Sequence, residues 1–307
     1  MTTSATRLTA RTPEDLLAAV PLVLGFRPHD SVVLMTFGGP DPFHARLDLP
    51  RTRAEVPHVV RALLEPALRH AVHAVVVVVY AEGSRVPGAD RVARTLRRRF
   101  LASGVQVVQV LRADARCWRV LLPDGDTGPA VPYDVSSHPF TAQAVLEGRA
   151  LLGSRAELEA LLDPDPAEVA AVAGLLPRSV PAGPADAEGA VARHLASGRL
   201  PDDVLASVLL GLDDPDVRTA ACAALRRADA EVHVRLWTDA VRRAPAEVRA
   251  GAAAVLALAA WVSGHGALAW CAVDRCRALE PGNTLARLVA VALEQAVPPT
   301  TFESRGA

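Results

Sequence analysis

Residues Ala74–Tyr80 read AVVVVVY, and this run of five consecutive valines constrains the fold more than any other segment. Branched side chains fit the pleated surface of a sheet better than the crowded surface of a helix, so the run predicts a strand. Because its apolar residues do not alternate with polar ones, both faces of that strand should be covered. We therefore predict a central strand in a sheet flanked by helices.

The segments around this strand complete an α/β pattern. Residues 31–37 (SVVLMTF) predict a second strand, and residues 43–49, in which apolar and polar side chains alternate, predict its antiparallel partner. A predicted helix at about 89–101 and a predicted strand at 105–111 follow the valine run. A strand, a helix and a strand in this order predict two parallel strands with a right-handed crossover.

Further helices and loops are indicated by local signals. Residues 12–15 (TPED) combine a hydroxyl cap, a proline at the first helical position and two acids, so they predict a helix start. Pro21 should kink or end that helix, because proline cannot donate a hydrogen bond. Residues 53–69 predict a second helix, residues 117–122 (CWRVLL) an edge strand, and residues 122–138 a loop.

The second half of the chain predicts helices only. Proline and capping residues begin these helices, glycine ends them, and no convincing strand follows Pro139. We expect an α/β domain over residues 1–150 and a helical domain over residues 151–307, with a linker-like stretch near 175–186. Residues 216–225 and 247–256 resemble each other, which leaves two alternatives open for the helical domain, an ordinary bundle or a repeat-like array.

Length and charge limit the functional classes. The chain has 307 residues and a formal net charge of -1. A chain of this length predicts two domains, and its near-neutral charge argues against nucleic acid as a partner held mainly through phosphate contacts. Arg91, Arg94 and Arg98 share one predicted helix face, but no aromatic residues lie between them, so we interpret this face as solvated.

The sequence predicts a cytoplasmic protein that does not enter a membrane. Its longest apolar helical stretch, residues 252–262, is too short to span a bilayer, and residues 1–15 lack the apolar core of a secretory signal. The four cysteines form no CxxC pair and fit no zinc spacing, which indicates free thiols in a reducing compartment. No metal is indicated, and no particular cofactor can be named.

Three separated strings together resemble one protein family. They are DLLAAVPLVLGFRPHDSVVL at residues 15–34, ARLDLP at 45–50 and LALAAWVSGHGALAWCAVDRCRALEPGNTLARLV at 256–289. In this order they resemble the DUF4192 family of high-GC bacteria, over nearly the whole chain. The resemblance implies no reaction. The chain departs from the family pattern after Trp118, where VLLPDGDTGP replaces a cysteine-containing loop, so no thiol or metal role is expected there.

Two groups of polar residues are candidates for a binding site. Ligands of open α/β sheets bind beyond the carboxyl ends of the strands, which singles out the loop after Tyr80. The second group lies where the predicted hairpin returns to the start of its first strand. The candidate residues of the two groups are Glu82, Ser84 and Arg85, and His29, Asp30, Ser31 and Asp48. The alternatives are a solvated loop for the first group and strand or turn capping for the second.

Two functional hypotheses follow. The first is a binding or scaffold protein whose α/β half recognises a small molecule or a partner and whose helical half offers a surface to a protein partner. The second is an enzyme of unknown class that acts on a small molecule at the strand ends, with catalytic residues that the sequence does not identify. Convergence of Asp30, Asp48, Glu82 and Arg85 in one deep pocket would favour the enzyme.

Overall fold

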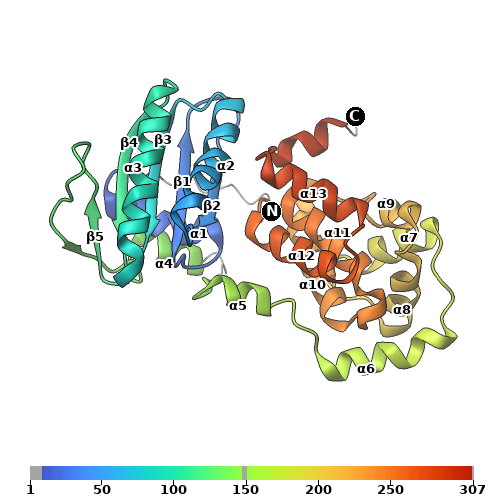
Figure 1. Ribbon diagram of the computed structural model, residues 1–307. Coiled ribbons are helices and arrows are strands. Elements are labelled where there is room, and N and C mark those ends of the chain that lie inside the picture. The colour runs from blue at the N-terminus through green and yellow to red at the C-terminus, as the bar shows by residue number, and fades with distance from the viewer. Residues whose placement is uncertain (1–8, 147–150, 306–307) are drawn as a thin grey trace. The chain divides into compact units, whose positions relative to one another are not determined.

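The computed structural model of the protein describes residues 9–146 and 151–305 (Figure 1). The chain divides into two compact units, Met1–Arg155 and Ala156–Ala307, which we name the α/β unit and the helical unit. The predicted fold class is confirmed, because the first unit holds a mixed sheet with helices and the second holds helices. The predicted division after residue 150 falls beside residues 147–150, which lie outside the described residues, and stays a prediction.

The described part of the α/β unit forms a six-stranded sheet in the order β2-β1-β3-β4-β5-β6. Its strands are β1 (Ser31–Phe37), β2 (His44–Asp48), β3 (Ala74–Tyr80), β4 (Gln106–Ala113), β5 (Cys117–Val120) and β6 (Val131–Pro132). The valine strand β3 is central, antiparallel to β1 and parallel to β4. The predicted hairpin and the predicted parallel pair are therefore both confirmed.

Helices cover both faces of this sheet (Figure 1). Helices α2 (Val56–Arg69) and α3 (Val86–Ala102) pack with Val75, Val77 and Val79 on one face. Helix α1 (Pro13–Leu24) packs with Val76 and Val78 on the other, where α4 (Pro139–Leu146) lies against α1. Successive valines point to opposite faces of a strand, so burial on both faces explains why the run contains no polar residue.

Two local predictions for the α/β unit differ from the structure, namely the end of the helix that is one of two predicted effects of Pro21, and the edge position of β5. Helix α1 does not end at Pro21 but continues to Leu24, because proline removes only its own donor while its carbonyl still accepts from the Gly25 amide at 2.8 Å. Gly25, at a φ of 81°, ends the helix. Strand β5 is not an edge strand, because the predicted loop contains β6, which pairs with it.

The helical unit surrounds one central helix. Helix α11 (Arg249–Val262) is buried along almost its whole length and packs against α10, α12 and α13, with further contacts to α8 and α9. All of these helices are neighbours of α11 in the chain, a pattern that fits both predicted alternatives, an ordinary bundle and a repeat-like array. The other helices are α5 (Arg155–Ala160), α6 (Pro166–Leu175), α7 (Pro184–His194), α8 (Asp202–Gly211), α9 (Pro215–Ala221), α10 (Ala230–Arg243), α12 (Gly266–Leu279) and α13 (Thr284–Glu294).

Two sequence features of this unit differ from their expected roles. The similar segments 216–225 and 247–256 do not form equivalent helices, because α9 ends at Ala221 whereas α11 continues to Val262. The linker-like stretch near 175–186 lies within the helical unit, where the Ala182 amide donates to the Ser207 carbonyl at 2.9 Å. That stretch connects α6 with α7.

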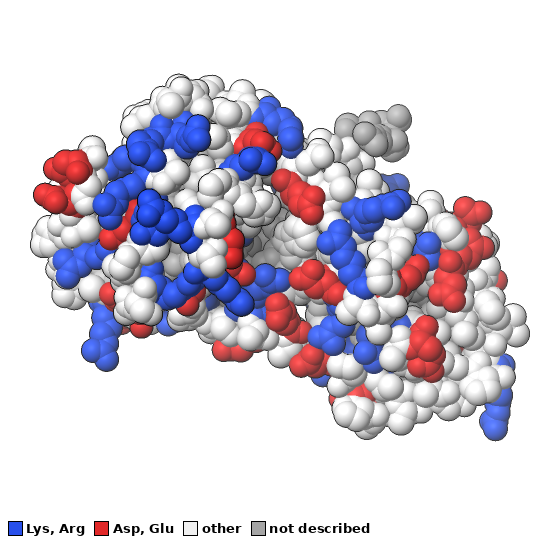
Figure 2. Space-filling model, in the orientation of Figure 1, with Lys and Arg blue, Asp and Glu red and all other residues white. Residues whose placement is uncertain are grey.

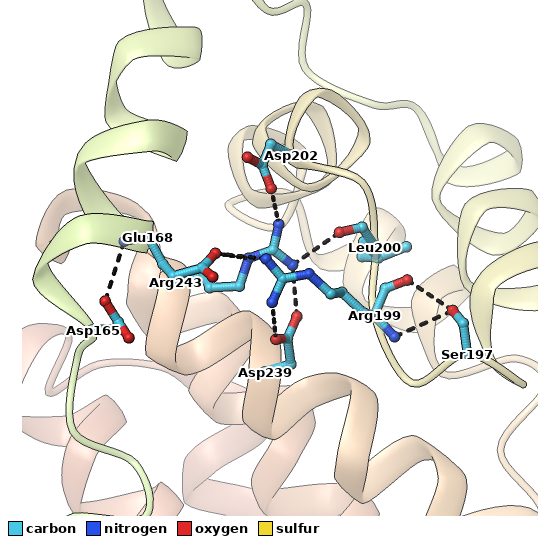
Figure 3. Close-up of polar contacts among 8 residues, drawn as sticks. All are labelled: Asp165, Glu168, Ser197, Arg199, Leu200, Asp202, Asp239 and Arg243. Atoms are coloured by element: carbon cyan, nitrogen blue, oxygen red, sulfur yellow. Dashed lines mark hydrogen bonds and ion pairs between the residues drawn. The ribbon is translucent and has the colours of Figure 1, made fainter.

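A network of charges around Arg243 joins three helices of this unit (Figure 3). The Arg243 side chain on α10 is 1% exposed and pairs with Glu168 of α6, Asp202 of α8 and Asp239 of α10. Arg199, which precedes α8, also pairs with Glu168 at 2.6 Å and with Asp239 at 2.9 Å. The network holds α6, α8 and α10 together through a largely buried guanidinium.

The two units differ in charge. Residues 1–155 contain 19 arginines against 14 acidic residues, whereas residues 156–307 contain 14 arginines against 20 acidic residues. Figure 2 shows arginine side chains gathered on the face of the α/β unit over α3. The small net charge of the chain therefore hides an excess of positive charge in one unit and of negative charge in the other. Within the described ranges, no helix has the length and apolar character needed to cross a bilayer.

Candidate functional site

The sheet register brings four strand ends to one edge. Ser31 at the start of β1 pairs with Asp48 at the end of β2 and with Tyr80 at the end of β3. Tyr80 pairs in turn with Ala113 at the end of β4. This edge contains the carboxyl ends of the two parallel strands, where α/β sheets place their ligands.

A pocket of about 440 Å³ opens at this edge. Its walls come from helix α1, the segment before β1, the loops after β3 and β4, and the segment after β6. The lining residues are Leu17, Pro21, Arg27, Pro28, His29, Asp30, Tyr80, Ala81, Glu82, Arg85, Ala113, Asp114, Ala115, Tyr133, Asp134 and Val135. The pocket thus combines apolar and aromatic walls with a small set of charged groups, as ligand sites commonly do.

The structure brings some of the predicted site residues together here and leaves others out. His29, Asp30, Glu82 and Arg85 line the pocket, whereas Ser31, Asp48 and Ser84 do not. Asp48 is 73% exposed and pairs with Arg46 at 2.6 Å. Ser31 is buried, where its Oγ donates to the His29 carbonyl at 2.5 Å and accepts from Arg46 Nε at 2.8 Å. The Ser31 and Asp48 side chains therefore tie the rim of the sheet together.

Arg85 and Asp30 are joined to each other and to the scaffold. Arg85 Nη2 donates to the Leu49 carbonyl at 3.0 Å, and Arg85 Nε lies 3.5 Å from Asp30 Oδ2. Asp30 has a φ of 42°, in the left-handed region, at the tight turn into β1. These two side chains shape one wall of the pocket and largely neutralise each other.

Asp114 is held by the turn that joins β4 to β5. Its Oδ1 accepts from the amides of Arg116 and Cys117, each at 2.7 Å, and its Oδ2 accepts from the Cys117 thiol at 3.2 Å. Burial acts to raise the pKa of Asp114, but these hydrogen bonds outweigh it and lower that pKa below its ordinary value. Asp114 is therefore an ionised group whose two oxygens are already engaged.

Two tyrosines of the pocket differ in how their hydroxyls are satisfied. The Tyr133 hydroxyl donates to the Asp114 carbonyl at 2.8 Å, and burial together with the Asp114 charge raises its pKa to about 12. Tyr80 is 7% exposed, and its hydroxyl has no hydrogen-bond partner among the residues that the structure describes. Burial raises the pKa of Tyr80 well above its ordinary value.

One acidic and one basic side chain of the pocket have polar atoms without a hydrogen-bond partner among the described residues. Glu82 Oε1 accepts from the Ala115 amide at 3.1 Å, which fixes the side chain and leaves Oε2 open. The Arg27 backbone amide donates to the Leu152 carbonyl at 3.0 Å, while no hydrogen bond or ion pair joins its guanidinium to a described residue. In the same part of the chain, no group of three or more His, Cys, Asp or Glu side chains is placed to hold a metal ion.

Sequence reasoning missed several of these residues. Asp114 follows β4, which is parallel to β3, so the strand-end rule that singled out Glu82 applies equally to Asp114. Tyr80 ends the valine strand, and the sequence predicts it only as a strand residue and not as a site residue. Tyr133 comes from a segment that the sequence predicts only as loop, and no local signal places it at this edge.

Comparisons with known proteins give one match. A family model described as "Domain of unknown function (DUF4192)" matches residues 13–300, a range that contains all three strings on which the resemblance rests. No curated protein and no solved structure matches the chain.

Proposed function

Because the chain belongs to the DUF4192 family, whose description assigns no activity, we propose its function from its own residues: the protein binds a small molecule in the pocket at the carboxyl ends of β3 and β4. The volume of about 440 Å³ supports this proposal, since small-molecule sites occupy roughly 300–1,000 Å³. The position of the pocket also supports it, because ligands of open α/β sheets bind beyond these strand ends.

The observation that carries the proposal is the Tyr80 hydroxyl. The hydroxyl is buried without a partner among the described residues, and Tyr80 is one of the residues that line the pocket. A buried polar group left in this state costs about 1–3 kcal/mol. A ligand that hydrogen-bonds to the hydroxyl would recover this free energy, so the group favours the bound state over the empty one.

Binding is better supported than catalysis. A general acid or base works best with a pKa near the operating pH. Burial raises the pKa of Tyr133 to about 12 and that of Tyr80 well above its ordinary value, while hydrogen bonds lower that of Asp114. The enzyme alternative keeps some support from Asp30, Glu82 and Arg85, which line one pocket, but Asp48 does not join them.

The substitution Tyr80→Phe tests the proposal. It removes the unpartnered hydroxyl and keeps the ring, so we expect the unliganded variant to be more stable than the wild type by about 1 kcal/mol. We expect the same variant to bind a ligand more weakly. The measurement is a thermal-shift screen of a small-molecule library against the full chain and the variant, because binding to the folded state raises its melting temperature.

Tyr133→Phe is the matched control. It deletes a hydroxyl that already donates to the Asp114 carbonyl, so it should lower the stability of the unliganded protein. A screen in which no compound stabilises the wild type would contradict the proposal. A compound that stabilises the wild type and Tyr80→Phe equally would contradict the role of the Tyr80 hydroxyl.

Two further parts of the proposal concern location and partners. We place the protein in the cytoplasm, which is supported by its free thiols at Cys117, Cys222, Cys271 and Cys276. We assign a protein-binding role to the helical unit, which is supported by the exposed apolar side chains Leu279, Leu288 and Val291 on α12 and α13. Cross-linking of the full chain in cells, followed by identification of the joined peptides, would test both.

A further inference from the structure

We infer that the ligand of the strand-end pocket is a small zwitterion of the amino-acid type, whose amine faces Glu82 and whose carboxylate faces Arg27. This inference rests on the proposed function and narrows it to one chemical class. The charged groups around the pocket are of two kinds. Some already have hydrogen-bond or ion-pair partners within the protein, and others, which we call open, have polar atoms without such a partner.

Most of the charges are engaged. Arg85 Nη2 donates to the Leu49 carbonyl, and its Nε, which makes no hydrogen bond with a described residue, lies 3.5 Å from Asp30 Oδ2. Both oxygens of Asp114 accept hydrogen bonds from the turn between β4 and β5. Asp134 accepts from the amide and the hydroxyl of Ser136 at 2.8 and 2.9 Å. These groups already have partners within the protein, so a ligand gains less from them than from a group without a partner.

Glu82 is the open acid. Its Oε1 is fixed by the Ala115 amide, so the carboxylate is held in place while Oε2 remains available. A side chain that is already oriented loses little conformational entropy when it binds a ligand. An ammonium group is the natural partner of such a carboxylate, because a charge-assisted hydrogen bond is about twice as strong as a neutral one.

Arg27 is the open base. Its backbone amide donates a hydrogen bond to the Leu152 carbonyl, and the preceding residue, the buried Phe26, forms a parallel β-bridge with Leu152. Its guanidinium has no hydrogen bond or ion pair with a described residue, although the side chain lines the pocket. A planar guanidinium matches the two oxygens of a carboxylate.

The two open charges act on the same hydroxyl. After burial, which has the largest effect, the pKa of Tyr133 is lowered by Arg27 and raised by Glu82. Both charges therefore lie within electrostatic reach of Tyr133, and a ligand beside that ring would meet one charge of each sign. We therefore expect a ligand with one charge of each sign to bind more tightly than a simple amine or a simple acid.

A ligand with a single charge would be repelled by the charged groups of the same sign in the pocket. A carboxylate without an amine would face the acids Asp30, Glu82, Asp114 and Asp134, which outnumber the two arginines of the lining. An amine without a carboxylate would leave the Arg27 guanidinium unpaired and would be repelled by it. The apolar walls formed by Leu17, Pro21 and Val135 accommodate the body of the ligand, and the Tyr80 hydroxyl suits a polar group on that body.

The test uses sets of three related compounds with the full chain. Each set contains a free amino acid, the desamino acid that lacks the amine and the amine that lacks the carboxylate. Affinities are measured by calorimetry for the wild type, Arg27→Gln and Glu82→Gln. We expect the free amino acid to bind the wild type about ten-fold more tightly than either partial compound, because each partial compound lacks one charge-assisted hydrogen bond.

Each variant should remove one preference and keep the other. Arg27→Gln should bind the amino acid and the amine that lacks the carboxylate with the same affinity. Glu82→Gln should bind the amino acid and the desamino acid with the same affinity. Arg98→Gln on α3 and Glu65→Gln on α2 are matched controls, because both side chains are exposed and lie outside the pocket lining. These controls should keep the wild-type preferences.

The outcomes separate this inference from the function on which it rests. A desamino acid or a simple amine that binds the wild type as tightly as its parent amino acid would overturn the inference. If no amino acid binds while a compound of another class binds in a manner that depends on Tyr80, the inference fails and the proposed function stands. If no small molecule binds the wild type at all, both fail.

Discussion

Asp15 links two walls of the pocket. Its Oδ2 accepts from the amides of Arg11 and Thr12 at 2.7 and 2.9 Å, which caps helix α1. Its Oδ1 lies 3.1 Å from Nε2 of His138, in the segment that follows Tyr133. Helix α1 supplies Leu17 and Pro21 to the pocket, so the Asp15 carboxylate connects this helix to the segment after β6.

Asp15→Asn should remove the ionisable carboxylate from this link. The hydrogen bond from Arg11 is the main cause that holds the pKa of Asp15 below its ordinary value of 3.8. A carboxyl group with a lower pKa in the folded state stabilises the protein above that ordinary value, and this stabilisation is lost as the pH falls through the folded pKa. We expect the variant to be about 1 kcal/mol less stable at neutral pH.

Urea unfolding of the wild type and of Asp15→Asn over a range of pH measures this effect. The difference in the free energy of unfolding should narrow as the pH falls below about 4. Thr95→Ala is a suitable control, because the Thr95 hydroxyl donates to the Arg91 carbonyl and does not titrate. A difference for Asp15→Asn that is the same in acid and at neutral pH would contradict this account.

At the residue scale, the sequence predicts the pairing of Ser31 with Asp48 at the strand ends better than it predicts the lining of the pocket. The alternation over residues 43–49 fixes the hairpin register, and that register places Asp48 beside Ser31 as predicted. The strand-end rule likewise leads to Glu82 and Arg85. Tyr133 and Arg27 could not be assigned to the same pocket, because their approach depends on contacts between segments far apart in the chain and not on any local pattern.

At the scale of helices, close packing in the helical unit depends on a glycine. A Cβ atom added to Gly251 at the start of α11 would lie 2.6 Å from the Leu212 Cβ, which is closer than two carbons can approach. The absence of a side chain therefore sets the distance between α11 and the end of α8. Gly174 in α6 is a contrast, because a Cβ atom there would meet nothing within 4 Å.

Gly251→Ala and Gly174→Ala should change stability in opposite directions. We expect Gly251→Ala to destabilise the helical unit by about 1–3 kcal/mol, because the added methyl group forces the helices apart. Gly174→Ala should stabilise it by about 0.4–1 kcal/mol, because alanine restricts the unfolded chain without a clash in the folded one. Thermal unfolding of both variants checks the signs, and a stabilised Gly251→Ala would refute the packing argument.

The charge network in Figure 3 predicts unequal effects for its two arginines. Arg243→Met would remove the cation that pairs with Glu168, Asp202 and Asp239 and the donor to the Leu200 carbonyl, so we expect a loss of about 1–3 kcal/mol. Arg199 is 47% exposed, and Arg199→Met should cost less than about 1 kcal/mol. Denaturant unfolding of both variants compares them, and equal losses would show that burial does not govern the network.

The elements that the sequence predicts well are those with strong local patterns. The valine strand, the hairpin and the helices with proline and capping signals all appear near their expected places. Strand β6 was missed because two residues carry no periodicity, and its pairing with β5 is a long-range contact. Pro21 was misjudged because the helix ends where Gly25 permits a left-handed backbone, only four residues later.

For the whole molecule, composition alone is a poor guide to the two units. The net charge of -1 averages an arginine-rich α/β unit with an acidic helical unit, so arguments about partners apply to each unit separately. The division into an α/β part and a helical part was predictable, because the pattern changes from period two to helical spacing along the chain. For the helical part the sequence predicts either an ordinary bundle or a repeat-like array, and the contacts of α11 with its neighbours in the chain fit both.

The central claim is that the strand-end pocket of the α/β unit binds a small molecule. The most direct measurement is the change in backbone amide NMR shifts of the full chain on addition of a stabilising compound. We predict changes that cluster at residues 27–30, 80–85, 113–115 and 133–135. Changes that cluster instead in the helical unit, around the pocket of about 310 Å³ lined by Val234, Thr238 and Arg242, would contradict the claim.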